Sequence, residues 1–319
     1  MNQRVSQAGI ETTLRADAIL SESGIPAELM PAQSTRRFSD GADFRVEIPS
    51  VEGPQVLRAL LDEADLRGVT VNRVSQGSGA MTLSVAEQTE MAHIGADRAI
   101  EVCLFVGPRE EWGIAAMSRA DDGGAMHGSV RGLRQLRYAV EDVFRSVECG
   151  IRSFLIADLG LLDVLVGAQR AGAIPRDVVW KGSVLCAPSN PASLALLERL
   201  GATTVNLPTD MSIHELAEMR AITTAPLDLY VEAPDSMGGI VRGEQLADLV
   251  RVSRPLYAKF GLRNSVGLYP SGLHIVDQAS AIAREKVRRA GVALEWADRC
   301  GGGFRQTVGA AADLGIPVR

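Results

Sequence analysis

Short runs of β-forming residues alternate with helical patterns along most of this chain, and this alternation constrains the fold more than any other feature. Between the runs lie stretches with apolar residues at every third or fourth position, such as 53–68 and 132–150. This spacing is typical of amphipathic crossover helices. From Phe44 onward we count eight candidate strands, at residues 44–50, 69–76, 99–107, 153–158, 178–186, 203–208, 227–234 and 256–264.

Helix start signals lie between these strands, where the alternation requires them. A serine with a glutamate three residues later forms a capping box, and a cap followed by proline is a second common start. The chain has both kinds: Ser84 with Glu87, Ser212 with Glu215, and Asn190 with Pro191.

Strands that are separated by single helices must pair in parallel, and eight of them favour closure into a TIM-type (β/α)8 barrel. An open doubly wound parallel sheet is the alternative fold. The first strand is not followed by G-x-G-x-x-G or by a phosphate loop, which makes the open sheet the weaker prediction. We therefore expect residues 44–319 to form a barrel catalytic domain and residues 1–43 to form an N-terminal extension.

Two further segments have an expected place in a barrel. Residues 1–43 suggest one helix and a loop that closes one barrel end. Residues 108–129 form a long insertion after the third strand. Loops at that end of a barrel carry active sites, so the insertion is expected to lie over the site.

The composition excludes several classes of protein. An apolar content of 46% with 23% charged residues is that of a globular chain with a substantial core. The net charge of −6 and the lack of a lysine-rich run predict no nucleic-acid partner. The first residues do not resemble a secretory signal, and no apolar stretch of membrane-spanning length occurs. We expect a cytoplasmic protein without membrane contact, whose partner is a small anionic substrate and which forms a homo-oligomer if it associates at all.

Alternation along the strands identifies side chains that point into the barrel. In the first strand the apolar residues at 44, 46 and 48 face the helices, which turns Arg45 and Glu47 inward. The same count places Asn206 and Lys259 inside. In the strand 227–234 it places Asp228, Tyr230 and Glu232 inside, whereas Lys181 lies in a strand that is apolar on both faces.

Charged side chains inside a barrel must be paired, hydrated or used in chemistry, because burying an isolated charge costs several kcal/mol. An internal salt-bridge network is the structural alternative to a catalytic site. The candidate catalytic residues are Lys259, Glu232, Glu47, Asp158 and Lys181. The candidate substrate-binding residues are Arg73, Gln76, Asn206, Asp235, Arg263 and Asn264.

An inward lysine supports three mechanisms: imine formation, general base catalysis, or charge stabilisation of an enolate or carboxylate. The last requires the least change in the lysine pKa, and we place it first. Glu47, Asp158 and Glu232 could instead hold Mg²⁺ or Mn²⁺, because hard cations prefer oxygen ligands. No cofactor is firmly implied.

Glycine-rich turns follow the seventh and eighth strands, at residues 233–246 and 263–274, and another follows the second strand at 76–84. Such turns can present backbone N–H groups to an anion, and the seventh and eighth loops are the usual phosphate site of barrels. Glycine is also ordinary turn chemistry. Together with Arg73 and Arg263, these turns suggest a small anionic ligand.

The segment from "SFLIADLGLLDVLVGAQ" through "SNPASLALLERLGATTVNLPTDMSIHEL" to "LDLYVEAP" resembles a known family. It is similar to the barrel core of the collagenase-like peptidases of uncertain mechanism, number thirty-two in their class. The resemblance covers residues 151–235 and implies a barrel. It also implies peptidase activity, or hydroxylation with an iron–sulfur cluster. The family strand carries a glutamate, a histidine and following cysteines. Here Asp228 and Glu232 stand in it and no cysteine follows, so we expect a divergent member without an iron–sulfur cluster.

The leading hypothesis is an enzyme that acts on a small carboxylate- or phosphate-bearing metabolite by acid–base or lysine-assisted chemistry, of the lyase or isomerase type. Two alternatives stay open. A metal-assisted hydrolase or peptidase would need an activated water, and a non-catalytic subunit would use the barrel as a binding platform.

Overall fold

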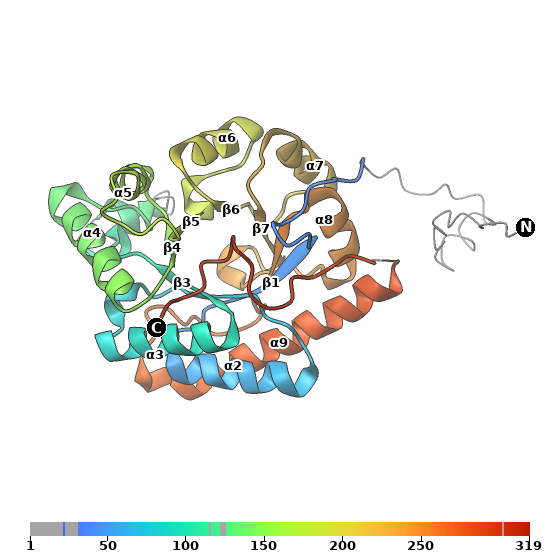
Figure 1. Cartoon of the computed structure of the whole chain (residues 1–319), viewed down its shortest axis with the longest axis horizontal. Helices are drawn as coiled ribbons and strands as arrows, with labels where there is room; N and C mark the ends of the chain where they lie inside the picture. The colour runs from blue at the N-terminus through green and yellow to red at the C-terminus, as the bar shows by residue number, and fades with distance from the viewer. Residues whose placement is uncertain (1–21, 23–30, 115, 122–125, 302) are drawn as a thin grey trace, which may run out of the picture.

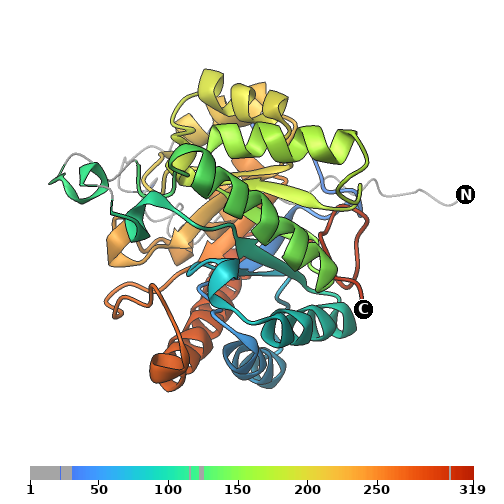
Figure 2. The same cartoon turned by 90° about the vertical axis from the view of Figure 1, so that its left-hand side faces the viewer.

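The eight strands form a closed parallel barrel in which each strand pairs with its neighbours in the chain and β8 pairs with β1. The computed structural model describes residues 22, 31–114, 116–121, 126–301 and 303–319. Helices surround the barrel on its outside, as the two views in Figures 1 and 2 show. The fold is (β/α)8, as the sequence predicts, and the open sheet is wrong.

All eight predicted strands are present, each shorter than the run that predicts it. They are β1 (Phe44–Pro49), β2 (Arg73–Gln76), β3 (Glu101–Phe105), β4 (Ser153–Ile156), β5 (Val179–Gly182), β6 (Thr204–Asn206), β7 (Leu227–Glu232) and β8 (Leu256–Phe260). The helices between and after them are α2 (Pro54–Arg67), α3 (Val85–Arg98), α4 (Gly132–Glu148), α5 (Leu159–Arg170), α6 (Pro191–Leu200), α7 (Ile213–Ile222), α8 (Leu246–Ser253) and α9 (Val276–Arg299).

The predicted helix starts are confirmed. The side chains of Ser84 and Ser212 accept hydrogen bonds from the backbone N–H groups of Glu87 and Glu215, which close both capping boxes. Asn190 caps α6, with Pro191 as its first helical residue. These caps satisfy backbone donors that a helix N-terminus otherwise leaves unpaired.

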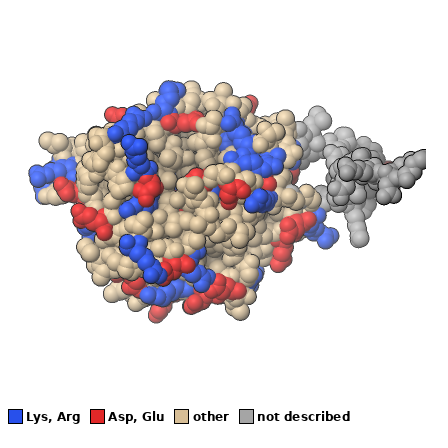
Figure 3. Space-filling model, viewed as in Figure 1, with Lys and Arg blue, Asp and Glu red and all other residues tan. Residues whose placement is uncertain are grey.

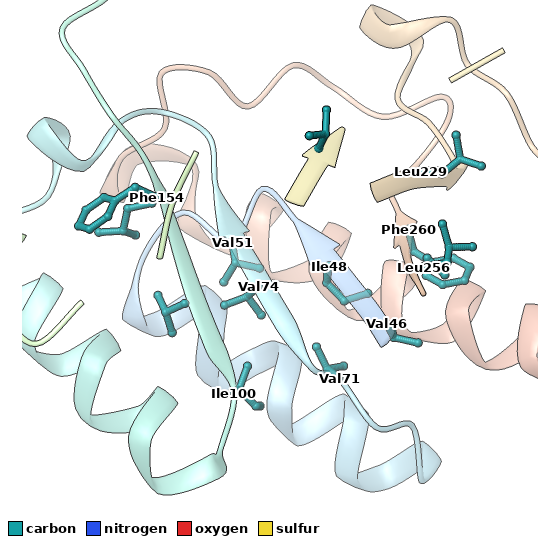
Figure 4. Packing of buried hydrophobic residues seen from close by; sticks show 14 of the residues in the cluster. Val46, Ile48, Val51, Val71, Val74, Ile100, Phe154, Leu229, Leu256 and Phe260 are labelled. Carbon is teal, nitrogen blue, oxygen red and sulfur yellow. The ribbon is translucent and has the colours of Figure 1, made fainter. Parts of the chain in front are cut away.

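The hydrophobic core lies between the barrel and its helices. Val46, Ile48, Val74, Leu229 and Phe260 point outward from their strands into this layer, as Figure 4 shows, and all are buried. Their alternate neighbours on the same strands are therefore turned into the barrel. The apolar layer fixes the register, because a slip of one residue would exchange the two faces.

Residues 31–43 and the chain after α9 close the N-terminal end of the barrel. Phe38 and Ala42 pack with Tyr257 and Leu314 in a small separate cluster. The backbone N–H of Asp43 donates to a carbonyl in the C-terminal segment over 2.7 Å. The described part of the predicted extension thus lies at one barrel end. Residues 1–21 and 23–30, which make up most of the segment in which one helix is expected, lie outside the described residues.

The insertion after β3 begins with two short 3-10 helices, Glu110–Trp112 and Met117–Arg119. Its two ends are held together, because the backbone N–H of Glu110 donates to the carbonyl of Ser129 over 2.8 Å. It leaves the barrel from the carboxyl end of β3, as predicted, on the side where the other strand-to-helix loops also lie.

The described helices include none that is long and apolar enough to span a membrane. On the face seen in Figure 3, lysine and arginine side chains alternate with aspartate and glutamate side chains. This mixture agrees with a chain that carries 33 basic and 39 acidic residues.

Candidate active site

Six charged side chains meet inside the barrel, and we call this set the interior network. Its members come from six different strands and are at most 4% exposed: Glu47, Arg73, Glu101, Lys181, Asp228 and Lys259. Strand pairing brings them together, because Glu47 is level with Arg73 on one side and with Lys259 on the other. The three cations and three carboxylates balance in charge.

Glu47 is the central carboxylate of the interior network. The Lys181 ammonium donates to both carboxylate oxygens, at 2.5 Å from Oε2, and the Ser75 hydroxyl donates to Oε1 over 2.6 Å. Burial alone would raise the pKa of Glu47, but the charges of Lys181, Lys259 and Arg73 hold that pKa well below its ordinary value. Glu47 is therefore an anion at neutral pH.

Arg73 is the network cation with the most partners. Its guanidinium contacts Glu101 over 2.8 Å, Asp228 over 3.1 Å and Glu47 over 3.2 Å. It also lies over the Tyr257 ring, 3.5 Å from the centroid. Arg73 is the first residue of β2, whereas the sequence suggested that it lies at the end of this strand. A substrate would have to compete with these three carboxylates for the guanidinium, and the predicted role of Arg73 as a substrate anchor stays a prediction.

Lys259 lies inside the barrel, as alternation along β8 predicts. Its ammonium donates to the Asn206 amide oxygen over 2.5 Å and lies 3.5 Å from Oε1 of Glu47. The same ammonium lies 4.4 Å from the centroid of the Tyr230 ring. Asn206 is thus a positioning group for the lysine, and Tyr230 contacts it from the adjacent strand.

Lys181 also points into the barrel, where it is buried and paired with Glu47. The sequence alone left its direction open, because its strand is apolar on both faces. Besides Glu47, it lies 3.7 Å from Asp228. Burial lowers the pKa of Lys181, and the charge of Glu47 offsets part of that effect. With two carboxylates beside it, this lysine serves the network rather than an external ligand.

Glu232 does not point toward Lys259, and here the prediction from alternation is wrong. A register irregularity lies between Tyr230 and Glu232, so that Glu232 is level with Phe260, whose side chain faces the helices. The Glu232 carboxylate accepts from the backbone N–H of Arg263 over 3.1 Å and lies 3.8 Å from the guanidinium of Arg289 on α9. The irregularity moves the carboxylate from the interior to the helix layer.

Asp158 and Gln76 both organise backbone near the strand ends. The Asp158 carboxylate caps α5 by accepting from the N–H of Leu161 over 2.8 Å, and it accepts from Val130 over 3.2 Å. The Gln76 amide donates to the carbonyl of Gly79 and accepts from its N–H, which folds the turn after β2. Neither side chain reaches the interior network in these bonds.

Asp235, Arg263 and Asn264 come together on the loops after β7 and β8. The Asn264 N–H donates to the Asp235 carboxylate over 2.6 Å, and the Arg263 guanidinium lies 4.0 Å from the same carboxylate. Asn264 has a positive φ of 56°, a conformation that asparagine tolerates better than most residues. The Arg263 side chain is 60% exposed, so it can contact a ligand at this barrel end.

A cavity of about 430 Å³ opens at the same barrel end, and we call it the mouth cavity. Its volume suits a small metabolite. The walls combine apolar groups and hydroxyls with one ammonium and two carboxylates, and they include Ser50, Glu111, Tyr230, Asp235, Tyr269 and Lys286. Tyr230 therefore joins the mouth cavity to Lys259 of the interior network.

Lys286 is a cavity residue that the sequence reading missed. It extends from α9, is 3% exposed, and donates to the carbonyl of Pro49 over 2.7 Å. Burial lowers the pKa of Lys286 to about 8, although the Glu52 carboxylate nearby favours the charged form. A signal was present, because Lys286 stands at helical spacing with the apolar residues Ile282 and Ala290, where a surface lysine would not.

The glycine turn after β2 holds a carboxyl group that belongs to the protein itself, and burial raises the pKa of this group. The backbone N–H groups of Gly77 and Ser78 donate to the two oxygens of the buried Glu52 carboxylate, over 2.9 and 3.0 Å. A side chain at Gly77 would collide with the Tyr269 ring, 2.3 Å from an added Cβ. This turn is therefore filled, and an external phosphate would have to displace Glu52.

The three carboxylates suggested as metal ligands lie in different surroundings: Glu47 in the network, Asp158 at a helix cap and Glu232 beside Arg289. Within the part of the chain that the structure describes, no three histidine, cysteine, aspartate or glutamate side chains are grouped to hold a metal ion. Metal dependence stays a prediction for experiment.

Neither any protein family model nor any curated protein matches the chain. Many solved structures resemble it at low identity. The copper homeostasis protein CutC from Streptococcus agalactiae is 13% identical over 67% of this chain and 97% of its own, with a TM-score of 0.46. A U32 peptidase is 17% identical over 66% of this chain and 74% of its own, with a TM-score of 0.37. A 2,3-dimethylmalate lyase is 13% identical over 82% and 91%, with a TM-score of 0.45. These likenesses concern the fold and carry no information on activity.

Proposed function

We propose that this chain is an enzyme that binds a small carboxylate- or phosphate-bearing metabolite at the mouth cavity and performs acid–base chemistry of the lyase or isomerase type. The observation that carries the proposal is the position of Lys259. It is a buried cation in contact with Tyr230, and Tyr230 lines a cavity of metabolite size at the carboxyl end of the strands. Active sites of (β/α)8 enzymes lie at that end.

The role we assign to Lys259 is stabilisation of negative charge that develops on the substrate. Glu47 and Asn206 hold the ammonium in place before any substrate arrives, so little reorganisation is needed during the reaction. Lys259 is 4% exposed, and its ammonium lies over the Tyr230 ring, which lines the mouth cavity. A substrate in the cavity would therefore contact Tyr230 before it reaches Lys259.

Tyr230 can act with the lysine. Burial raises the pKa of Tyr230, so its hydroxyl stays protonated at neutral pH and can donate a hydrogen bond. A substrate oxygen in the mouth cavity would meet this hydroxyl first, with the charge of Lys259 behind it. An enolate or carboxylate is the kind of group that such a pair stabilises.

Two cations at the mouth cavity could hold an anionic substrate, beside the Glu111 and Asp235 carboxylates that also line the cavity. Lys286 lines the cavity, and Arg263 follows Leu262, which also lines it. Arg263 is exposed and has one carboxylate neighbour at 4.0 Å, which leaves donor groups for a ligand. On the resemblance of residues 151–235 we further propose a divergent relative of the U32 peptidases that has turned to a small metabolite.

The test is conversion of a defined mixture of 2-oxo acids, hydroxy acids and sugar phosphates, followed by proton NMR. Wild type is expected to convert at least one compound. Lys259→Met should abolish conversion, whereas Lys259→Arg keeps the charge and should retain part of it. Arg67→Met, which removes an exposed cation of a surface pair on α2, is the control and should behave as wild type.

Two results would contradict the proposal. The first is full conversion by Lys259→Met, which would remove the lysine from the reaction. The second is a wild-type protein that neither converts nor binds any compound of the mixture. In that case the hydrolase or the non-catalytic binding subunit becomes the better hypothesis.

A further inference from the structure

We infer that Lys286 is a second functional amine, and that it condenses with the carbonyl group of a small compound bound in the mouth cavity to form an imine. The inference goes beyond the proposed role of Lys259, which keeps its charge. It assigns covalent chemistry to a different lysine on the outer helix α9.

The first support is the placement of the amine. Lys286 is 3% exposed to solvent, yet it lines a cavity of about 430 Å³. Apolar residues such as Ile282 and Leu268 line the same cavity. Burial of the amine limits the access of bulk water to an imine formed there, which slows its hydrolysis.

The second support is the small number of partners around the amine. The only hydrogen bond that Lys286 makes to the described residues is to the Pro49 carbonyl, and no carboxylate of the described residues lies within 4.0 Å of the ammonium. Lys181, by contrast, is bonded to both oxygens of Glu47. Lys286 is thus the least paired of the three lysines in the chain.

The charges that face Lys286 decide its protonation. Glu52, on the loop after β1, favours the charged form, but burial outweighs it and lowers the pKa of Lys286 to about 8. Glu111 and Asp235 line the cavity from the loops after β3 and β7. A substantial fraction of the amine is neutral at mildly alkaline pH, and only the neutral amine is a nucleophile.

The reaction balances without a further reagent. The neutral Nζ attacks the carbonyl carbon to give a carbinolamine, and a proton moves from nitrogen to oxygen. The hydroxyl then takes up a second proton and leaves as water, and the nitrogen loses its remaining proton, so that the net products are a neutral imine and one water. Tyr230 and Tyr269 line the same cavity, and we assign to the Tyr230 hydroxyl the hydrogen bond to the departing oxygen, because the Tyr269 hydroxyl is paired with Ser50 over 2.6 Å.

The experiment is reductive trapping of the imine, and the small number of lysines in the chain makes the labelled residue easy to assign. The chain holds three lysines, Lys181, Lys259 and Lys286, so a peptide map assigns an adduct without ambiguity. The folded protein is incubated with pyruvate and, separately, with acetaldehyde, each with cyanoborohydride, between pH 6 and 9. Intact mass and peptide mapping then locate the label.

We expect the label on Lys286, with a rate that rises with pH around the pKa of about 8. Lys286→Arg should lose the label and Lys259→Arg should keep it. Because the wild-type peptide map already names the residue, a variant that folds poorly does not weaken the test. Labelling by acetaldehyde alone would still support the inference and would show that the carboxylate of pyruvate is not required.

Label on Lys259 with Lys286 unmodified would overturn the inference, and so would no label on either lysine in protein shown to be folded by circular dichroism. These failures are separable from a failure of the proposed function. Loss of conversion in Lys259→Met together with an unlabelled Lys286 leaves the first proposal standing. A labelled Lys286 in a protein that converts no compound of the mixture would support the imine and contradict the proposed function.

Discussion

Lys181 on β5 and Lys259 on β8 direct their ammonium groups at the same carboxylate oxygen, Oε1 of Glu47 on β1. One carboxylate thus holds two lysines that lie 78 residues apart in the sequence, as the difference between 259 and 181 gives. Arg73 contacts the other oxygen of the same group over 3.2 Å. Stability and the proposed chemistry therefore both depend on Glu47.

Glu47→Gln should be strongly destabilising. The change removes a buried negative charge and leaves Lys181, Lys259 and Arg73 with unbalanced positive charge. Breaking a buried ion pair on one side costs about 3–5 kcal/mol. Urea denaturation monitored by circular dichroism measures the free energy of unfolding. The matched control is Glu90→Gln, which breaks a partly exposed pair with Arg58 and should cost at most about 1 kcal/mol. Equal small effects in the two variants would show that the network adds no such stability.

Asp158 is expected to act as a helix cap and not as an acid or base. Asp158→Ala should lower the free energy of unfolding by about 1 kcal/mol, because α5 loses its N-cap. Asp158→Asn keeps a capping oxygen and should stay close to wild type in stability and in conversion of the metabolite mixture. An asparagine variant of normal stability that converts nothing would restore the catalytic role that the sequence suggested.

The free energy of unfolding should depend on pH in a way that reflects the titration of Lys286. Its pKa in the folded protein is about 8, below the ordinary value of 10.5, so between these values the unfolded chain binds more protons. Stability then rises with pH across that window, by roughly 3 kcal/mol in total for this group. Buried thiols such as Cys103, whose pKa burial raises to about 11, act in the opposite direction above pH 9.

The measurement is therefore a difference between wild type and Lys286→Met, in which the contributions of the cysteines cancel. The free energy of unfolding of wild type should increase relative to that of the variant as the pH rises from 8 toward 10.5. A constant difference across this range would mean that the lysine titrates alike in the folded and unfolded chain.

Removal of divalent metal should leave binding and conversion unchanged. The described carboxylates Glu47, Asp158 and Glu232 have protein partners and do not converge. Dialysis against EDTA, followed by the NMR assay with and without added Mg²⁺ or Mn²⁺, measures the effect. A loss of conversion that either metal restores would favour the metal-assisted hydrolase hypothesis and would require ligands that the present site does not group.

The barrel could be predicted because each strand has an apolar face that must meet the helices, and this also turns Arg45, Glu47 and Lys259 inward. The same reasoning fails at Glu232, because a register irregularity after Tyr230 breaks the alternation without a sign in the composition. Alternation fixes direction only, since it tells neither the height of a residue in the barrel nor its partners.

The roles of Arg73 and Lys286 could not be predicted, because they depend on which residues surround these side chains in the folded barrel. Arg73 has the residue type of an anion anchor, but three carboxylates from three other strands engage it, and their convergence depends on barrel closure. Alternation along the strands does not identify Lys286, because this lysine reaches the mouth cavity from the helix α9. Its position on the apolar face of α9 is the pattern that would have found it.

The most direct test of the central claim is a crystal structure of the protein with the compound that it converts fastest in the NMR assay. We predict electron density in the mouth cavity, in contact with Tyr230 and within reach of Lys259 or Lys286. Density elsewhere would contradict the account. The groove of about 320 Å³ between α2, α3 and the loop before α9, which Arg58 and Glu90 line, is the clearest alternative place.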